Sequence, residues 1–375
     1  MRKHSLLFIG ALPPPYHGVT VFNEGLLNSK IADIYKVYHL DTSDKRNLDN
    51  LGKADLQNVY LALKNLWVLI KLCIRKKPDL VYLPIAQNIA YLRDGMFIII
   101  AKFLGKAKIV IHVHGSYFKQ YYNNTNWFMK QFIDFTMKQV NTAIVIGDSL
   151  KYVIDSWVKD VQVVPNGTPF NPKLHNKFKR NIGSVTISYL GNLFESKGVL
   201  DVVKAAKIVV DKYPKVRFKF AGSWWAQEPE TKKYAFRFIR ENHLGNNIEF
   251  VGRVLGSEKE RFLIDTEIFV FPSWYKYETQ GIVNIEAMAA GCPVISTKNV
   301  GAIFETVIDG KTGILVEKKN PKAIAEAIIK LIENPELRIK MGMAGRKRYE
   351  QYYTQEKNIE NMIRVFEGAL KREKA

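Results

Sequence analysis

Two glutamates and a glycine near residue 280 have the types and spacing of a site for a phosphorylated ligand. Glu278 and Glu286 lie eight residues apart, with Gly281 between them. Because 282–290 has helical character, we expect a helix to begin near Gln280, where its free amides and its dipole would favour a phosphate. Eight residues of helix span about 12 Å, so the carboxylates could reach opposite ends of a nucleotide diphosphate sugar. The alternative is a surface helix with two solvated glutamates.

Three further residues stand where ligands commonly bind, at the ends of expected strands. Lys197 opens a helix after the run 186–192, Gly18 follows the first apolar run, and His114 ends the run 108–115. In open α/β sheets, ligands bind at the carboxyl ends of the strands. Each residue also has an ordinary interpretation, as a first-turn lysine, a turn glycine or a structural histidine. His112 should face the same side of its strand as His114, one layer deeper.

Short apolar, β-branched runs alternate with amphipathic stretches and supply the strands that position these residues. Such runs are typical of parallel strands that are covered on both faces. The alternation in both halves predicts an α/β protein with two doubly wound domains. The expected strands are 5–11, 36–41, 79–85, 108–115, 142–148 and 161–165, then 186–192, 217–223, 248–253, 268–274, 292–298 and 313–318.

The expected domains follow from composition. The first covers residues 1–165 and the second 185–354. Between them, 166–184 is rich in Pro, Asn, Gly and charge, which is typical of a linker. The last stretch, 355–375, predicts a helix that could cross back to the first domain.

The second half of the chain resembles the retaining glycosyltransferases of the GT-B fold, of the group 1 or family 4 type. That family has a Glu, seven residues, a second Glu and then Ala-Met-Ala-x-Gly-x-Pro-Val, which stands here as Glu278, Glu286 and 287–294. The likeness continues through 301–321 and is weaker but traceable in the N-terminal half. It implies two Rossmann-like domains facing across a cleft, with the acceptor on the N-terminal domain and the nucleotide-sugar donor on the C-terminal one.

The resemblance also implies roles for the candidate residues. Lys197, Glu278 and His114 would be catalytic. The expected donor-binding residues are Gly18, Asn192, Lys197, Gly281, Ile282, Val283 and Glu286. Glu286 would accept hydrogen bonds from the ribose, and Glu278 would position the sugar rather than attack it. The implied reaction retains the anomeric configuration, forms no covalent enzyme intermediate, and requires neither a metal nor a cofactor besides the donor.

The sequence departs from the family pattern at three positions. Asn192 stands where the family has an Arg that grips the diphosphate, and an amide cannot neutralise charge. Gln280 replaces a frequent Phe. Gly18 stands alone where the family often has paired glycines. The first departure leaves Lys197 and the helix amides to hold the diphosphate, unless another cation substitutes.

Composition indicates an ordinary globular protein in a reducing, cytoplasmic compartment. There are only two cysteines, Cys73 and Cys292, which form neither a disulfide framework nor a metal cluster. The first apolar run is short and is followed by prolines, so we expect a buried strand rather than a signal peptide. No apolar run is long enough to span a bilayer.

The formal net charge of +20 points to an anionic partner without identifying it. Stretches 58–77 and 116–138 interleave aromatic and basic residues, which is typical of peripheral binding to an anionic membrane, although 58–77 could equally be a core helix. The implied acceptor is a glycan or a lipid-linked molecule, in surface polysaccharide or glycolipid synthesis. The alternatives are a basic nucleic-acid-binding protein, which we consider unlike this chain because it has no zinc-finger or RNP-type motif, and a GT-B relative with epimerase or inverting activity.

Overall fold

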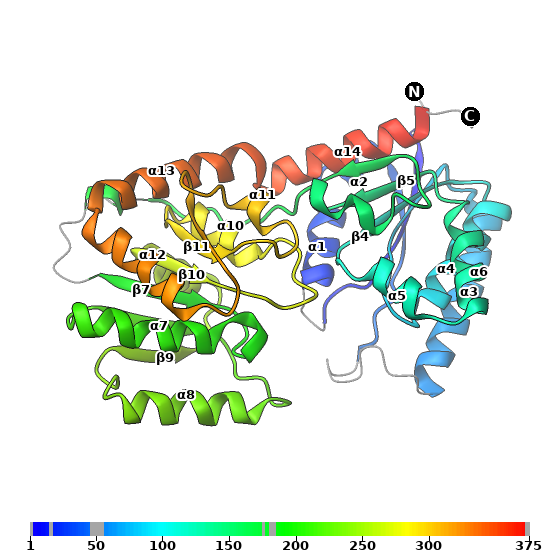
Figure 1. Ribbon diagram of the computed structural model, residues 1–375. Helices are drawn as coiled ribbons and strands as arrows, with labels where there is room; N and C mark the ends of the chain where they lie inside the picture. The colour runs from blue at the N-terminus through cyan, green and yellow to red at the C-terminus, as the bar shows by residue number, and fades with distance from the viewer. Residues whose placement is uncertain (1–2, 15–17, 46–55, 175–176, 180–184, 372–375) are drawn as a thin grey trace. The chain divides into compact units, whose positions relative to one another are not determined.

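The computed structural model describes residues 3–14, 18–45, 56–174, 177–179 and 185–371. Two compact units make up the chain (Figure 1). The first unit comprises residues up to Pro165 together with those from Asn358 onward, and the second comprises Asn166–Lys357. Each unit is built on its own parallel six-stranded sheet, which is the α/β class expected from the alternating pattern.

The sheet of the first unit has the strand order β2-β1-β3-β4-β5-β6, and every neighbouring pair is parallel. Its central strands are buried because their near-continuous apolar runs are covered on both faces. The strands are β1 (Ser5–Ile9), β2 (Lys36–Leu40), β3 (Leu80–Pro84), β4 (Lys108–Val113), β5 (Thr142–Val145) and β6 (Val161–Val163).

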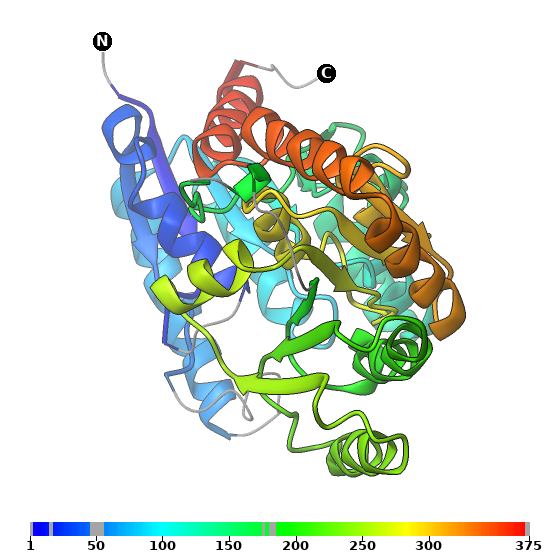
Figure 2. The ribbon, with the colours of Figure 1, turned by 90° about the vertical axis from the view of Figure 1, so that its left-hand side faces the viewer.

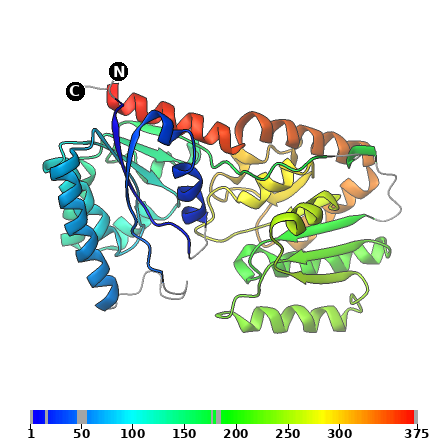
Figure 3. The same cartoon turned by 180° about the vertical axis from the view of Figure 1, so that it is seen from behind.

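Helix α4 of the first unit packs against both α3 and α6. The C-terminal helix α14 packs against the strands (Figure 3). Its Phe366 is fully buried, and the centroid of the Phe366 ring lies 5.5 Å from that of Tyr82. The helices of this unit are α1 (Gly18–Leu27), α2 (Ile31–Ile34), α3 (Leu56–Lys76), α4 (Tyr91–Phe103), α5 (Phe118–Asn124), α6 (Trp127–Met137) and α14 (Gln355–Lys371). The first three residues of α14 belong to the second unit.

The sheet of the second unit has the strand order β12-β11-β10-β7-β8-β9. The order reverses between β7 and β10, which are parallel neighbours, so the loops after these two strands leave the same edge of the sheet in opposite directions. The strands are β7 (Thr186–Leu190), β8 (Arg217–Ala221), β9 (Ile248–Gly252), β10 (Ile268–Phe271), β11 (Val294–Thr297) and β12 (Gly313–Val316).

Helices cover both faces of the second sheet, with α7 and α9 on opposite sides (Figure 2). Helix α7 packs against α8 and α12, and α10 packs against α13. The helices are α7 (Val199–Lys212), α8 (Pro229–Glu241), α9 (Gly256–Ile264), α10 (Ile282–Ala289), α11 (Ile303–Thr306), α12 (Pro321–Glu333) and α13 (Pro335–Tyr352).

The stretch expected as a linker, 166–184, belongs to the second unit. Its residues 175–176 and 180–184 lie outside the described residues. In the described part, the Thr168 amide donates to the Tyr353 carbonyl at 3.0 Å. The Lys177 ammonium donates to carbonyls at the end of α9, including that of Ile264 at 2.6 Å. These bonds tie the stretch to the body of the second unit.

Candidate functional site

The loops after β7 and β10 form the candidate site, at the point where the strand order of the second sheet reverses. The Trp274 amide of one loop donates to the Ser196 carbonyl of the other at 2.8 Å. Gly198 has a φ of +81°, and a Cβ there would lie 2.5 Å from the Pro272 carbonyl oxygen. The two loops therefore approach so closely that only glycine fits between them.

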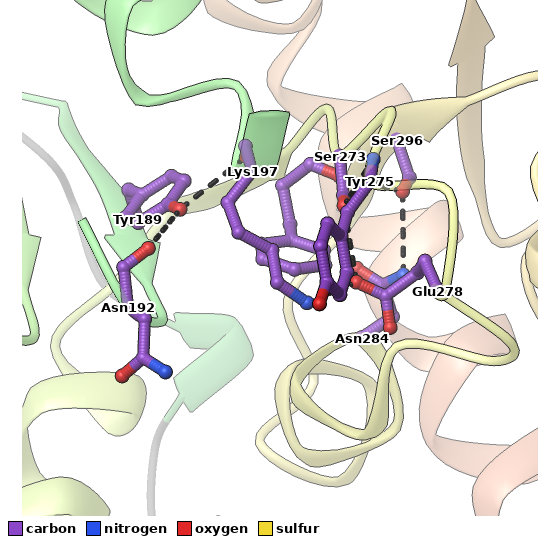
Figure 4. A network of polar contacts seen from close by, with 9 residues as sticks. Tyr189, Asn192, Lys197, Ser273, Tyr275, Glu278, Asn284 and Ser296 are labelled. Carbon is purple, nitrogen blue, oxygen red and sulfur yellow. Dashed lines mark hydrogen bonds and ion pairs between the residues drawn. The ribbon is translucent and has the colours of Figure 1, made fainter. Parts of the chain in front are cut away.

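An ion pair between Lys197 and Glu278 lies at the centre of this site (Figure 4). The Lys197 Nζ and the Glu278 Oε2 are 2.6 Å apart, and their side chains are only 17% and 11% exposed. Ser273 Oγ donates to the same carboxylate oxygen at 3.0 Å, and the ammonium lies 4.8 Å from the centroid of the Tyr275 ring. Charges so far removed from water need partners of opposite charge, and here Lys197 and Glu278 are partners of each other.

The start of α10 lies beside this pair. The helix begins at Ile282 and is preceded by Gly281, whose φ of +65° suits glycine. Asn284, the third helical residue, is fully buried and donates from Nδ2 to Ser296 Oγ at 3.2 Å. This bond anchors the helix start to the end of β11. The amides of Ile282 and Val283 belong to the first turn, where amides have no partner within the helix.

The helix starts two residues later than the sequence led us to expect, at Ile282 instead of near Gln280. Glu278 therefore lies in the preceding loop, and only Glu286 lies on the helix. Gln280 is buried, and its Oε1 accepts a hydrogen bond from the Asn166 amide at 2.9 Å. The expectation of eight helical residues between the two carboxylates was wrong, since the positive φ of Gly281 interrupts the chain between them.

Glu286 forms a second ion pair, with Lys259 of α9. The Lys259 Nζ lies 2.6 Å from the Glu286 Oε1, and the Glu286 side chain is only 9% exposed. Both candidate carboxylates are thus largely buried and paired, which contradicts the alternative of two solvated surface glutamates. Lys259 was missed by the sequence reasoning because a lysine on an amphipathic helix carries no signal that distinguishes it from a surface residue.

Asn192 does not join the charged cluster. Its side chain is exposed and points away from Lys197 and Glu278 (Figure 4). Its carbonyl accepts a hydrogen bond from the hydroxyl of Tyr189 at 3.1 Å, and that hydroxyl also lies 3.3 Å from the Lys197 carbonyl. Burial raises the pKa of Tyr189 well above its usual value, so the hydroxyl stays protonated and bridges the turn that carries Lys197.

Gly18 and His114 lie in the first unit. Gly18 is the first residue of α1, and a Cβ there would meet nothing within 4 Å. His114 follows β4 and stacks on His112, with ring centroids 3.8 Å apart. His112 is fully buried, as expected for the deeper layer, and this burial holds its pKa well below the usual value. Its ring is therefore neutral, with Nδ1 at 2.8 Å from the Tyr82 hydroxyl.

Among the described residues, no group of three acidic, cysteine or histidine side chains is placed to hold a metal ion. Nor does any helix within the described ranges have the length and apolar character needed to cross a membrane.

Comparisons with known proteins identify a family for the second unit. Residues 170–348 match the family described as Glycosyl transferases group 1. The chain is 32% identical over 260 residues to the capsular polysaccharide biosynthesis glycosyltransferase CapM of Staphylococcus aureus, in a match that covers 63% of this chain and 66% of CapM. The match thus spans slightly less than two thirds of that relative.

Solved structures share the whole fold at low identity. A glycosyltransferase from Rickettsia africae superposes with a TM-score of 0.77 at 18% identity, with both chains covered completely. HepE of Anabaena, solved in complex with UDP, has a TM-score of 0.71 at 17% identity, with 97% of this chain and 100% of HepE covered.

Two parallel α/β units of this kind, together with these structural neighbours, define a GT-B fold. The carboxylates at the switch point of the second unit stand in the segment that carries the family motif. Residues 170–348 belong to the group 1 glycosyltransferase family, also called family 4. This membership favours the transferase over the nucleic-acid-binding, epimerase and inverting alternatives.

Replacement of Lys259 by Met should destabilise the second unit by about 1–3 kcal/mol, because the Glu286 carboxylate would lose its charged partner while remaining buried. The control is Arg261→Met, an exposed position on the same helix, where we expect a change within about 0.5 kcal/mol. Urea unfolding of both variants makes the comparison. Equal stability of the two variants would mean that the Lys259–Glu286 pair contributes nothing to the fold.

Proposed function

We propose that this protein transfers a sugar from a nucleotide-diphosphate sugar to a hydroxyl of a glycan or lipid-linked acceptor, with retention of the anomeric configuration. The observation that carries the proposal is the Lys197–Glu278 pair beside the first turn of α10, at the switch point of the second sheet. A cation, amides without helical partners and a carboxylate there suit a diphosphate joined to a sugar.

We assign the donor to the second unit. The diphosphate would bind Lys197 and the amides of Ile282 and Val283, with Gly281 allowing its close approach. Glu286 would accept hydrogen bonds from the ribose hydroxyls. Glu278 would hold the sugar once the diphosphate has replaced it as the partner of Lys197. Asn192 can offer only a hydrogen bond, because its side chain is neutral and exposed.

The chemical step breaks the bond between the anomeric carbon and a phosphate oxygen. Negative charge then grows on the leaving diphosphate, where Lys197 and the α10 amides stabilise it. The acceptor hydroxyl attacks the face that the leaving group vacates, and its proton passes to the leaving phosphate. Glu278 positions the sugar and forms no covalent bond. The diphosphate is neutralised by protein groups, so the step as proposed requires no metal.

We assign the acceptor to the first unit. His114 lies at the carboxyl end of β4 and is proposed to contact the donor sugar. Gly18 at the start of α1 is proposed to let the protein backbone approach a phosphate or sugar closely. The neutral His112 ring stacked beneath His114 supports that side chain from within the core. Catalysis then requires the two units to bring donor and acceptor together.

Similar proteins support a proposal for the donor base and for the pathway. HepE is solved in complex with UDP, which supports a UDP-sugar donor for this chain. CapM takes part in capsular polysaccharide biosynthesis, which supports a role in surface polysaccharide or glycolipid synthesis.

A thermal-shift panel of UDP-, GDP-, ADP- and dTDP-sugars tests the donor assignment. A UDP-sugar at about 100 times its dissociation constant should stabilise the second unit by about 2.7 kcal/mol. Glu286→Ala should lose most of this stabilisation because the ribose loses its acceptor. Glu258→Ala, at an exposed position on α9, should keep it. A panel without any hit on folded protein would refute the donor site, and an unchanged shift in Glu286→Ala would refute the ribose assignment.

We also propose a peripheral location at the cytoplasmic face of a membrane. Tyr60, Trp67 and Ile74 recur along one face of α3 and are 63%, 58% and 57% exposed. The Lys71 ammonium lies 3.1 Å from the centroid of a Trp67 ring, and α3 contains no acidic residue. An aromatic and basic face of this kind fits the interface of an anionic bilayer.

Flotation with vesicles that contain anionic lipid tests this location at low salt. The protein should float with anionic but not with neutral vesicles, and Trp67→Ser should reduce the bound fraction severalfold because it removes the largest interfacial ring. The control Phe236→Ser changes a 46% exposed ring on α8 of the second unit and should leave binding intact. Protein that stays in the soluble fraction with anionic vesicles would contradict peripheral binding.

A further inference from the structure

A large cavity in the first unit meets the proposed site at His114 and otherwise extends away from it. Its volume is about 770 Å³, and it lies between the N-terminal halves of α3 and α4 and the carboxyl ends of β1 and β3. Its walls are mainly apolar and include Leu66, Ile85, Met96 and Phe97. A cavity of this size and lining suits an apolar ligand, or the apolar part of an amphiphile.

The outer end of the cavity is bordered by apolar residues that are also exposed to solvent. Val59 and Leu63 of α3 are 54% and 61% exposed, and Ile89 and Leu92 beside the start of α4 are 57% and 47% exposed. All four line the cavity. Exposed apolar side chains around the mouth of an apolar cavity give a long hydrocarbon chain a continuous path from the protein surface to the interior.

The inner end of the cavity is polar and lies at the edge of the sheet where we place the chemistry. Gly10, Ala11 and His114 line it, together with Asn23. Asn23 is fully buried, and its Nδ2 donates to the Ala11 carbonyl at 2.9 Å. Its Oδ1 has no hydrogen-bond partner among the described residues. Buried acceptors are rarely left unpaired, so this oxygen is suited to accept a hydrogen bond from a ligand hydroxyl.

Charge does not dominate the lining of the cavity. The charged residues that line it are Asp44, Arg93 and Asp94, and the Arg93 guanidinium is bonded to Asp94 at 2.8 Å, so that pair adds no net charge. Helix α3 carries Lys64, Lys71 and Arg75 and has no acidic residue, but none of these three lines the cavity. The lining therefore selects for an apolar chain rather than for a charge.

We propose that this cavity binds the hydrocarbon chain of a lipid-linked acceptor, with the chain between α3 and α4 and an acceptor hydroxyl on the Asn23 Oδ1. The chain enters past Leu63 and Leu92, which places the polar part of the molecule beside His114. The cavity thus selects for acceptors that carry a long apolar chain. The inference that the occupant is an acceptor rests on the proposed glycosyltransferase function. The inference that the cavity binds a hydrocarbon chain does not depend on that function.

Titration calorimetry with alkyl glucosides tests the chain site without knowledge of the natural acceptor. Methyl, hexyl, octyl and decyl glucoside are used below the concentrations at which they form micelles. Affinity should rise by about fourfold for each methylene buried, and methyl glucoside should bind too weakly to measure. Equal affinity for all four glucosides, or no binding of any, would overturn the proposal.

A matched pair of variants locates the binding. Leu92→Asp places a charge at the mouth and should weaken the binding of decyl glucoside by at least tenfold. Leu104→Asp places the same charge at an equally exposed leucine that does not line the cavity, 48% against 47% exposed, and should bind like the wild type. An equal loss in both variants would indicate association with the outer apolar surface and would overturn a site in the cavity.

A third variant fills the cavity from inside. Ala62→Trp should abolish the dependence of affinity on chain length, whereas Gln57→Trp, at an exposed position of the same helix outside the cavity, should preserve it. If Ala62→Trp fails to fold, the Leu92 and Leu104 pair still decides. An unchanged chain-length dependence in a folded Ala62→Trp would overturn the proposal.

The UDP-sugar thermal shift, run on the same preparations, separates this proposal from the proposed function. Donor binding without chain-length dependence would refute the chain site alone. Chain-length dependence without donor binding would keep the chain site and refute the glycosyl transfer assigned to the protein.

Discussion

The ion pair between Lys197 and Glu278 is the interaction on which the candidate site depends. Both charges are largely withdrawn from water, so each is stabilised there by the other or by a replacement ligand. Their meeting requires the loops after β7 and β10 to touch, which the neighbouring positions of these strands and the glycine at 198 allow. The rest of the second unit holds these two loops in register.

Under the proposed function, the same pair would let the site be stable without a ligand and still bind a diphosphate. Glu278 supplies the negative charge that Lys197 needs in the absence of a ligand, and a diphosphate can take that place because it carries more charge and also meets the amides of α10. In this proposal the Glu278 carboxylate is then released toward the sugar. The Lys259–Glu286 pair repeats this arrangement at the fifth residue of the helix, so a ribose would also compete with a lysine for its carboxylate.

The strands and the positions of the carboxylates could be predicted from the sequence because both follow from local patterns. Apolar runs define buried parallel strands, and the family motif marks Glu278 and Glu286. The helix start was misplaced by two residues because the backbone turn at Gly281 is a tertiary constraint that periodicity does not record. The partnership of Lys259 with Glu286, the burial of Gln280 against Asn166 and the cavity between α3 and α4 arise from residues distant in the sequence, and a single chain gives no local signal for them.

Calorimetric titration of UDP into the wild type, Lys197→Met and Glu278→Gln tests the central claim most directly, namely that a diphosphate replaces Glu278 as the partner of Lys197. The account predicts at least tenfold weaker binding for Lys197→Met, a loss of about 1.4 kcal/mol. It predicts equal or tighter binding for Glu278→Gln, because the ammonium no longer has to leave a carboxylate. Wild-type affinity in Lys197→Met, or an equal loss in Glu278→Gln, would contradict the claim.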